Sequence, residues 1–310
     1  MIELLGSSLA RFICVHRRFQ ISSLALLASL AVQMNSMSEP SPLDDRVASQ
    51  IETREPQQRV VLIGASNLSI MFPTIVESLR AMFAHPIELH VAKGFGRSYG
   101  LHSKFFGKKF PGILSSGLWP ALNRARPLPT VAIVADIGND LAYEAPVDKI
   151  VEWVERALDR LAIHDARVAL NNLPIESLRG VGTARYYAFR EVLFPNCKLS
   201  RGEIIDRAER LSERLSQLAA TREISAFSAE RGWYGLDPIH PRLASAGEIW
   251  SRMLGALSGA AGGAKLVRPS AAMMLTYRRL RALEYAHFGV VRRAEQPALR
   301  CLDGTRISIY

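Results

Sequence analysis

The sequence predicts an α/β fold of three layers, in which helices cover both faces of a mainly parallel sheet of five strands. Two observations predict it. Between residues 59 and 257, short apolar segments alternate with longer segments whose apolar residues recur at helical spacing. The segment TVAIVADI at 130–137 is apolar on both faces, which is typical of a central strand in a sheet that is covered on both sides.

Five segments have the length and apolar content of buried strands. The first is RVVLIG, and the five together occupy residues 59–64, 86–92, 130–137, 166–171 and 223–227. Strand–helix alternation joins parallel strands through right-handed crossovers, and ligands bind at the carboxyl ends of such strands. The residues that directly follow each strand are therefore the first place to look for a site.

Four segments have the periodicity of helices. The clearest lies at 147–163, where Ile150, Val154 and Leu158 fall on one face and charged residues on the other. The remaining three lie at 69–84, 203–221 and 243–257. Together with the strands, these helices define a predicted catalytic domain at 59–258.

The residues before this domain resemble a leader and a linker, and we expect 1–58 to lie outside the fold. The apolar segment at 21–32 follows a basic His-Arg-Arg tripeptide, as in a secretory signal, but no A-x-A cleavage site follows it. Met34 and Met37 offer alternative starts. A start at either one favours the cytoplasm, whereas a true signal at 1–36 implies a secreted or membrane-anchored protein.

The residues after this domain, 259–310, are expected to form a small extension. The small-residue segment SGAAGGAK indicates a boundary. Helical spacing follows at 271–288, and Asp303-Gly304 between alternating residues predicts a hairpin. We expect this extension to be dispensable for chemistry. The alternative is that its helix packs over the rim of the site and its hairpin extends the sheet.

The net charge of +10 is concentrated in the extension. From residue 265 onward there are nine Lys and Arg residues but only three Asp and Glu, which accounts for +6 of that charge. A basic tail of this kind can make weak contact with anionic surfaces. The central domain is nearly neutral, so no specific nucleic-acid partner is expected.

Composition excludes several classes of protein. Apolar residues make up 48% and charged residues 22%, which is typical of a globular protein rather than a disordered one. No run of about 18 apolar residues occurs, which argues against a polytopic membrane protein. The three cysteines lie far apart without a CxxC, and no His, Cys and carboxylate spacing suggests a metal. We therefore expect neither a metal nor a cofactor.

Polar residues and glycines follow the predicted strands in a characteristic order. Gly64-Ala65-Ser66 follows the first strand, and KGFGRSYG at 93–100 follows the second. Gly138-Asn139-Asp140 comes after the third, and Asp237-Pro238-Ile239-His240 comes after the fifth. Each element alone is weak evidence, but all of them converge on one edge of the predicted sheet.

In this order of motifs the sequence resembles the SGNH (GDSL-like) hydrolase family over residues 59–257. The resemblance implies the flavodoxin-like fold of that family and the hydrolysis of esters. The resemblance also implies that Ser66 is the nucleophile and that Asp237 and His240 are the other two members of the catalytic triad. It implies that Ser66, one glycine and Asn139 form the oxyanion hole. Asp140 is expected only to cap the following turn.

Two positions depart from the family pattern. Ala65 stands where the family commonly has an acidic residue before the serine. The second motif lacks the asparagine that commonly opens it, so the oxyanion glycine is ambiguous between Gly94 and Gly96. We favour Gly96, because Gly96-Arg97-Ser98 fits the family pattern better.

These residue types suit acyl transfer. A serine hydroxyl needs a base to take its proton, and His240 is the candidate. Asp237 would hold the far nitrogen of the ring. Backbone amides of Ser66 and Gly96, with the side-chain amide of Asn139, would stabilise the oxyanion.

The predicted function is therefore a serine ester hydrolase that acts through an acyl-enzyme on a small-molecule, carbohydrate or lipid ester. Two alternatives stay open. One is an acyltransferase that uses the same site, and the other is a binding module that has the architecture but no activity. A nucleotide-binding protein is disfavoured, because GASNLS lacks both the G-x-G-x-x-G fingerprint and the P-loop lysine.

Overall fold

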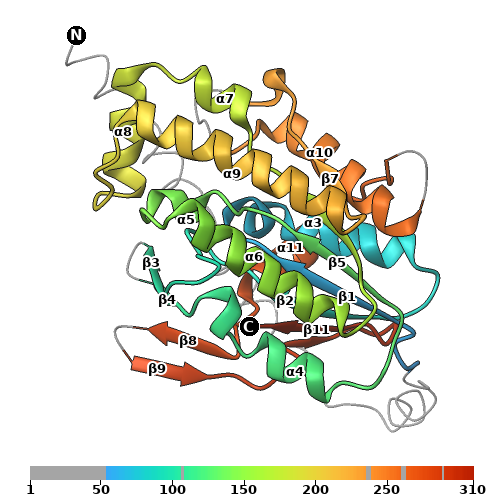
Figure 1. The fold of residues 1–310 in the computed structure, drawn as a ribbon. Coiled ribbons are helices and arrows are strands. Elements are labelled where there is room, and N and C mark those ends of the chain that lie inside the picture. Colours follow the sequence, from blue (N-terminus) through green and yellow to red (C-terminus); the bar gives the residue numbers. More distant parts are fainter. Residues whose placement is uncertain (1–53, 106–107, 235–238, 260–262, 288–289) are drawn as a thin grey trace, which may run out of the picture. The chain divides into compact units, whose positions relative to one another are not determined.

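A mainly parallel sheet organises the chain in the computed structural model (Figure 1). The model describes residues 54–105, 108–234, 239–259, 263–287 and 290–310, so most of the leader expected at 1–58 lies outside it. The strands from the central part are β1 (Gln58–Ile63), β2 (Ile87–Ala92), β5 (Thr130–Val134), β6 (Arg167–Asn171) and β7 (Ser225–Phe227). They lie in the order β2-β1-β5-β6-β7, all parallel, which is the flavodoxin-like order.

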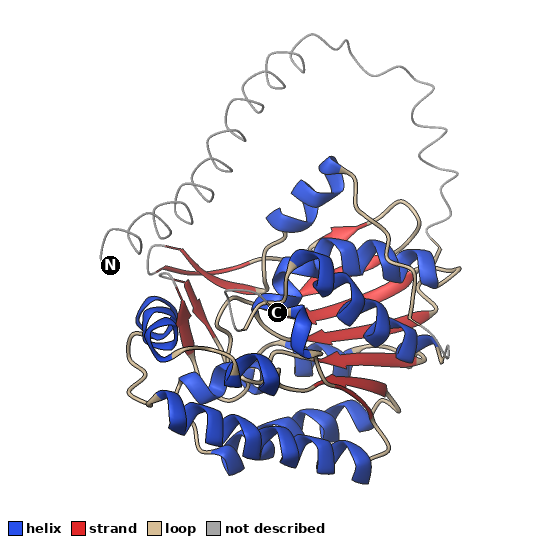
Figure 2. Ribbon diagram, turned by 90° about the horizontal axis from the view of Figure 1, so that it is seen from above, coloured by secondary structure: helices blue, strands red, loops and turns tan. Residues whose placement is uncertain are grey.

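Helices cover both faces of the sheet, as the sequence predicts (Figure 2). Alternate residues of β1 point to opposite faces, with Val60 and Leu62 in one hydrophobic core and Val61 and Ile63 in the other. The first core is covered by α3 (Ser66–Met82), α10 (Leu243–Ser258) and α11 (Ala271–Arg279). The second is covered by α4 (Leu118–Arg124), α6 (Val147–Ala162) and α9 (Arg201–Thr221). The predicted three-layer α/β/α fold is confirmed.

Several short elements were not predicted. They connect the main elements and surround the carboxyl edge of the sheet. They comprise β3 (Ser103–Phe105), β4 (Lys108–Phe110), η2 (Ile113–Ser115), α5 (Asn139–Ala142), α7 (Ile175–Arg179), α8 (Thr183–Leu193) and η3 (Arg231–Trp233). The helices α7 and α8 contain no buried residue, so they lack the apolar face that makes a helix visible in a sequence.

The described sheet has seven strands rather than the five predicted, because the C-terminal segment adds two. The hairpin expected at Asp303-Gly304 joins β10 (Leu299–Arg300) to β11 (Arg306–Ile309), and β11 pairs in parallel with β2. Gly304 has φ +90°, and a Cβ there would meet the backbone oxygen of Arg54 at 2.0 Å, so the turn requires glycine. This arrangement matches the alternative in which the hairpin extends the sheet.

The helix expected at 271–288 is shorter than predicted. It ends as α11 at Arg279, and the chain then forms β8 (Glu284–His287) and β9 (Val290–Arg293), an antiparallel pair. The chain leaves the helical conformation at Leu280, which has ψ 132°. Beyond the predicted helix, the β-branched pair Val290 and Val291 favours the strand β9.

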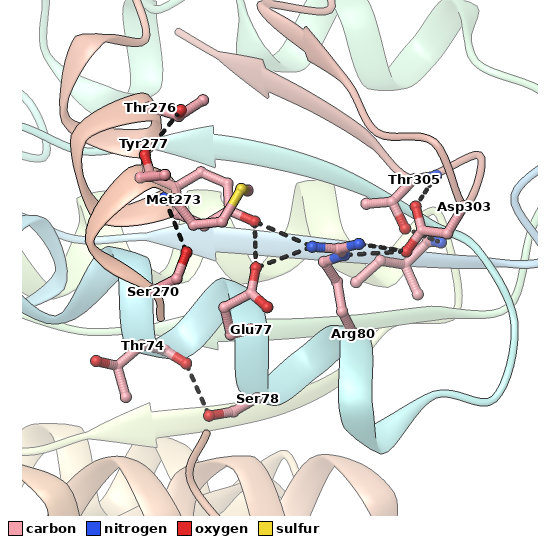
Figure 3. A network of polar contacts seen from close by, with 12 residues as sticks. Thr74, Glu77, Ser78, Arg80, Ser270, Met273, Thr276, Tyr277, Asp303 and Thr305 are labelled. Carbon is pink, nitrogen blue, oxygen red and sulfur yellow. Dashed lines mark hydrogen bonds and ion pairs between the residues drawn. The ribbon is translucent and has the colours of Figure 1, made fainter. Parts of the chain in front are cut away.

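An ion-pair network attaches the C-terminal segment to α3 (Figure 3). The Arg80 guanidinium lies 2.9 Å from a Glu77 oxygen and 2.8 Å from an Asp303 oxygen. It also donates to the Tyr277 hydroxyl at 3.3 Å. One side chain of α3 thus contacts both α11 and the turn that precedes β11.

Within the part of the chain that the model describes, no helix has the length and apolar character needed to cross a membrane.

Candidate active site

Ser66 and His240 meet at the carboxyl edge of the sheet. Ser66 is the first residue of α3, directly after the turn that leaves β1, and only 7% of it is exposed. His240 lies in the loop before α10, and its Nε2 atom is 2.8 Å from Ser66 Oγ. The two residues are 174 positions apart in the sequence. The fold thus brings together a hydroxyl and an imidazole at hydrogen-bond distance.

Asp136 fixes the turn that carries Ser66. It follows β5, the neighbour of β1, and has φ +59°. Its carboxylate accepts hydrogen bonds from the backbone N–H groups of Ala65 at 2.6 Å and Leu68 at 3.1 Å. Ala65 has no side chain that can cap α3, and Asp136 satisfies the free amides of the first turn in its place. Sequence reasoning did not identify this role.

Asn67 links the serine turn to the histidine loop. Its Nδ2 atom donates to Asp136 Oδ1 at 2.8 Å and to the carbonyl oxygen of Ile239 at 3.2 Å. Ile239 directly precedes His240. Asp136 and Asn67 are therefore hydrogen-bonded to each other and to the backbone on both sides of the site, next to Ser66 and next to His240.

The glycine segment after β2 lies beside Asn139. Gly96 has φ +63°, a conformation that favours glycine, and its carbonyl accepts a hydrogen bond from the Tyr143 hydroxyl at 2.5 Å. Asn139 Nδ2 lies 3.4 Å from the carbonyl oxygen of the next residue, Arg97. Gly94 packs closely on another residue, because a Cβ there would meet the Phe110 ring at 2.8 Å.

Asp140 anchors this glycine segment rather than capping a turn. It is fully buried, and its carboxylate accepts hydrogen bonds from the Ser98 hydroxyl and, at 2.9 Å, from the Tyr99 backbone N–H. Burial raises the pKa of the Asp140 carboxyl to about 6, although the bonds from Ser98 and Tyr99 lower it in part. The neighbours of Asn139 thus hold both the serine turn, through Asp136, and the glycine segment, through Asp140.

Asp237, the third predicted member of the triad, lies outside the described residues. Its place beside the far nitrogen of His240 stays a prediction. The roles of Ser66, Gly96 and Asn139 as oxyanion donors likewise stay predictions. Among the described residues, no group of three or more His, Cys, Asp or Glu side chains is arranged to hold a metal ion.

A cavity of about 150 Å³ opens beside the serine. Ser66, Asn67, Asp136 and Asn139 line one part of it. The remainder is mainly apolar and extends toward α7, α8 and α9. The site therefore combines a hydroxyl–imidazole pair with an adjoining apolar space.

Comparison with known proteins gives similarities of low identity. A crystal structure of TesA is 14% identical, with a TM-score of 0.43, and the match covers 64% of this chain and 98% of that one. A GDSL-like lipase from Bacteroides thetaiotaomicron is 12% identical (TM-score 0.42; 75% and 96% covered). An acetyl xylan esterase is 13% identical (TM-score 0.42; 62% and 98% covered). No family model and no curated protein sequence matches the chain.

Proposed function

We propose that the protein is a serine ester hydrolase in which Ser66 is the nucleophile and His240 is the general base. The observation that carries the proposal is the 2.8 Å separation between Ser66 Oγ and His240 Nε2. A base within this reach can take the hydroxyl proton as the oxygen attacks. The position of the pair, at the carboxyl edge of a parallel sheet and next to a cavity, is where such a sheet binds ligands.

The reaction would proceed in two balanced steps. Ser66 Oγ bonds to the ester carbonyl carbon while its proton passes to His240 Nε2. The carbon–oxygen bond to the alcohol then breaks, and the alcohol leaves with that proton. Water next attacks the acyl-enzyme and gives a proton to His240. The acid is released as Ser66 recovers its proton.

Stabilisation of the oxyanion would come from amide donors. Asn139 lines the same cavity as Ser66, and its Nδ2 atom lies at the glycine segment, 3.4 Å from the Arg97 oxygen. Asn139 adds a donor without a charge, while Gly96 allows close approach of its backbone. The carboxylate of Asp237 would accept a hydrogen bond from the far ring N–H of His240 and so fix the tautomer of the imidazole.

A serine-directed phosphonate tests this proposal. We expect it to modify the full-length protein once, at Ser66 when the labelled peptide is mapped by mass spectrometry. Ser66→Ala should abolish both labelling and the hydrolysis of 4-nitrophenyl acetate, with an unchanged thermal midpoint. Ser258→Ala is a matched control, because its hydroxyl bonds to Gly255 at the opposite end of α10 from His240. Labelling at another serine, or hydrolysis that survives Ser66→Ala, would refute the proposal.

A further inference from the structure

We infer that the apolar cavity beside Ser66 holds the acyl chain of the substrate and selects esters of medium chain length. This inference rests on the proposed function and adds a substrate class to it. Four features of the cavity support it: the cavity opens at Ser66, its wall is mainly apolar, the side chains of α8 that line it are not buried, and its volume fits a short hydrocarbon chain.

The cavity runs from Ser66 into a partly open, apolar space that is bordered by three helices. Beyond Asn139, its wall is formed by side chains from the segment after β6, from α7, from α8 and from α9. The apolar members that carry the argument are Leu173, Leu178, Phe189, Leu193, Ile204 and Ile205. An acyl group attached to Ser66 Oγ would have this space directly available.

The packing of α8 supports an occupant in this space. The helix carries Tyr186, Phe189 and Leu193, all of which line the cavity, yet none of its residues is buried. By contrast, the main helices α6 and α9 bury their apolar side chains. Aromatic and aliphatic side chains that face a cavity gain burial when a hydrocarbon chain enters it.

Both arginines of the lining donate hydrogen bonds to the protein itself, although Arg190 Nε has no hydrogen-bond partner among the described residues. Arg201 donates to the carbonyl oxygen of Arg179 at 2.7 Å, and Arg190 donates to that of Leu199 at 3.3 Å. Arg190 also forms an ion pair with Glu191. These contacts hold the segments around α8 together, and they favour a hydrocarbon over an anionic occupant.

The volume sets the chain length. An apolar cavity of about 150 Å³ in a protein can hold a group of about six carbon atoms, the size of benzene. The space beside Ser66 therefore suits an acyl group of about six carbons. Burial of each methylene should raise kcat/KM about fourfold until the cavity is full.

A series of 4-nitrophenyl esters from acetyl to dodecanoyl tests the inference with the full-length protein. We expect kcat/KM to rise about fourfold per methylene up to about hexanoyl and then to level off or fall. A profile that is flat, or that falls from acetyl onward while acetyl ester is still hydrolysed, would overturn the inference and leave the proposed function intact. Absence of all hydrolysis and of phosphonate labelling would instead contradict the proposed function.

Two substitutions at Ile205 assign the effect to this cavity. Ile205 lines the cavity on α9 and is only half-buried, so that its replacement disturbs little of the core. Ile205→Trp should shift the chain length at which kcat/KM is highest to shorter esters, and Ile205→Ala should shift it to longer ones. Ile163→Trp is a control, because Ile163 is 73% exposed at the end of α6. An optimum that moves in neither Ile205 variant, or moves equally in the control, would overturn the inference.

Discussion

The buried guanidinium of Arg97 donates a hydrogen bond to the main-chain oxygen of Tyr310, and this contact joins the glycine segment to the end of β11. Arg97 also donates to the carbonyl oxygens of Pro111 at 3.1 Å and Lys93 at 3.3 Å. Burial lowers the pKa of Arg97 to about 10, so that it stays charged at neutral pH. The glycine segment of the proposed oxyanion hole is therefore held by the C-terminal strand.

Arg97→Met should destabilise the fold by about 1–3 kcal/mol, because the buried main-chain oxygen of Tyr310 loses its donor and the part-buried oxygens of Pro111 and Lys93 lose theirs. The free energy of unfolding in urea gives the loss. Arg156→Met, at an exposed position of α6, is the control and should change stability by less than about 0.5 kcal/mol. A stability of Arg97→Met equal to that of the control would show that these contacts carry no weight.

The C-terminal strand should be necessary for the stability of the domain. Ile307 of β11 is fully buried between β2 and the layer of α3, so Ile307→Ala should cost about 2–5 kcal/mol. Leu302 lies in the same hairpin but is 89% exposed, and Leu302→Ala is the matched control. Equal thermal midpoints for the two variants would contradict this prediction and show that β11 adds little to the stability of the domain.

Asp140 should make stability depend on pH. Its pKa is about 6 in the fold against an ordinary value of 3.8, so between about pH 4 and 6 the folded state binds a proton that the unfolded state has released. The free energy of unfolding should therefore fall as the pH rises through this window, by about 3 kcal/mol in total, and change no further above it.

The test is a comparison of Asp140→Asn with the wild type in urea at several pH values. The amide cannot ionise, so the difference in unfolding free energy between the two proteins should change between pH 4 and 6 and be constant above pH 7. Parallel curves across the whole range would contradict the prediction.

Asn67 should act through the position of His240. Asn67→Ala removes the link between Asp136 and the Ile239 carbonyl, and we expect kcat to fall about 10-fold to 100-fold because His240 is misplaced. In a His240→Ala background the same change should cost little more. An equal loss in both backgrounds would mean that Asn67 acts by another route.

The main elements could be predicted because their residues carry a local pattern. The amphipathic spacing of α6 and the doubly apolar segment of β5 are visible in any window of the sequence. The strand β11 could be placed in a hairpin from Asp303-Gly304, but its pairing with β2 could not be read, because the partner lies more than 200 residues earlier. The hydrogen bond between Arg97 and Tyr310 could not be predicted for the same reason, because the two residues are 213 positions apart.

The site shows a similar division. The order of motifs brought Ser66, Asn139 and His240 to attention, but the role of Asp136 depends on the pairing of β1 with β5. That pairing places the residue after one strand beside the turn after the other. Ala65 was a signal for the role of Asp136. It has no side chain that can cap α3, at a position where the resemblance implies an acidic residue, so the acceptor for the free amides of α3 must come from elsewhere in the fold.

The account's most direct test is a double-mutant cycle between Ser66 and His240, read from the rate of hydrolysis of 4-nitrophenyl acetate. If the 2.8 Å contact transfers a proton in the reaction, His240→Ala should lose nearly as much kcat as Ser66→Ala, and the double variant should lose little more. All three variants should keep the wild-type thermal midpoint to within a few degrees. Losses that multiply in the double variant would show that the two side chains act independently, and would contradict the proposed mechanism.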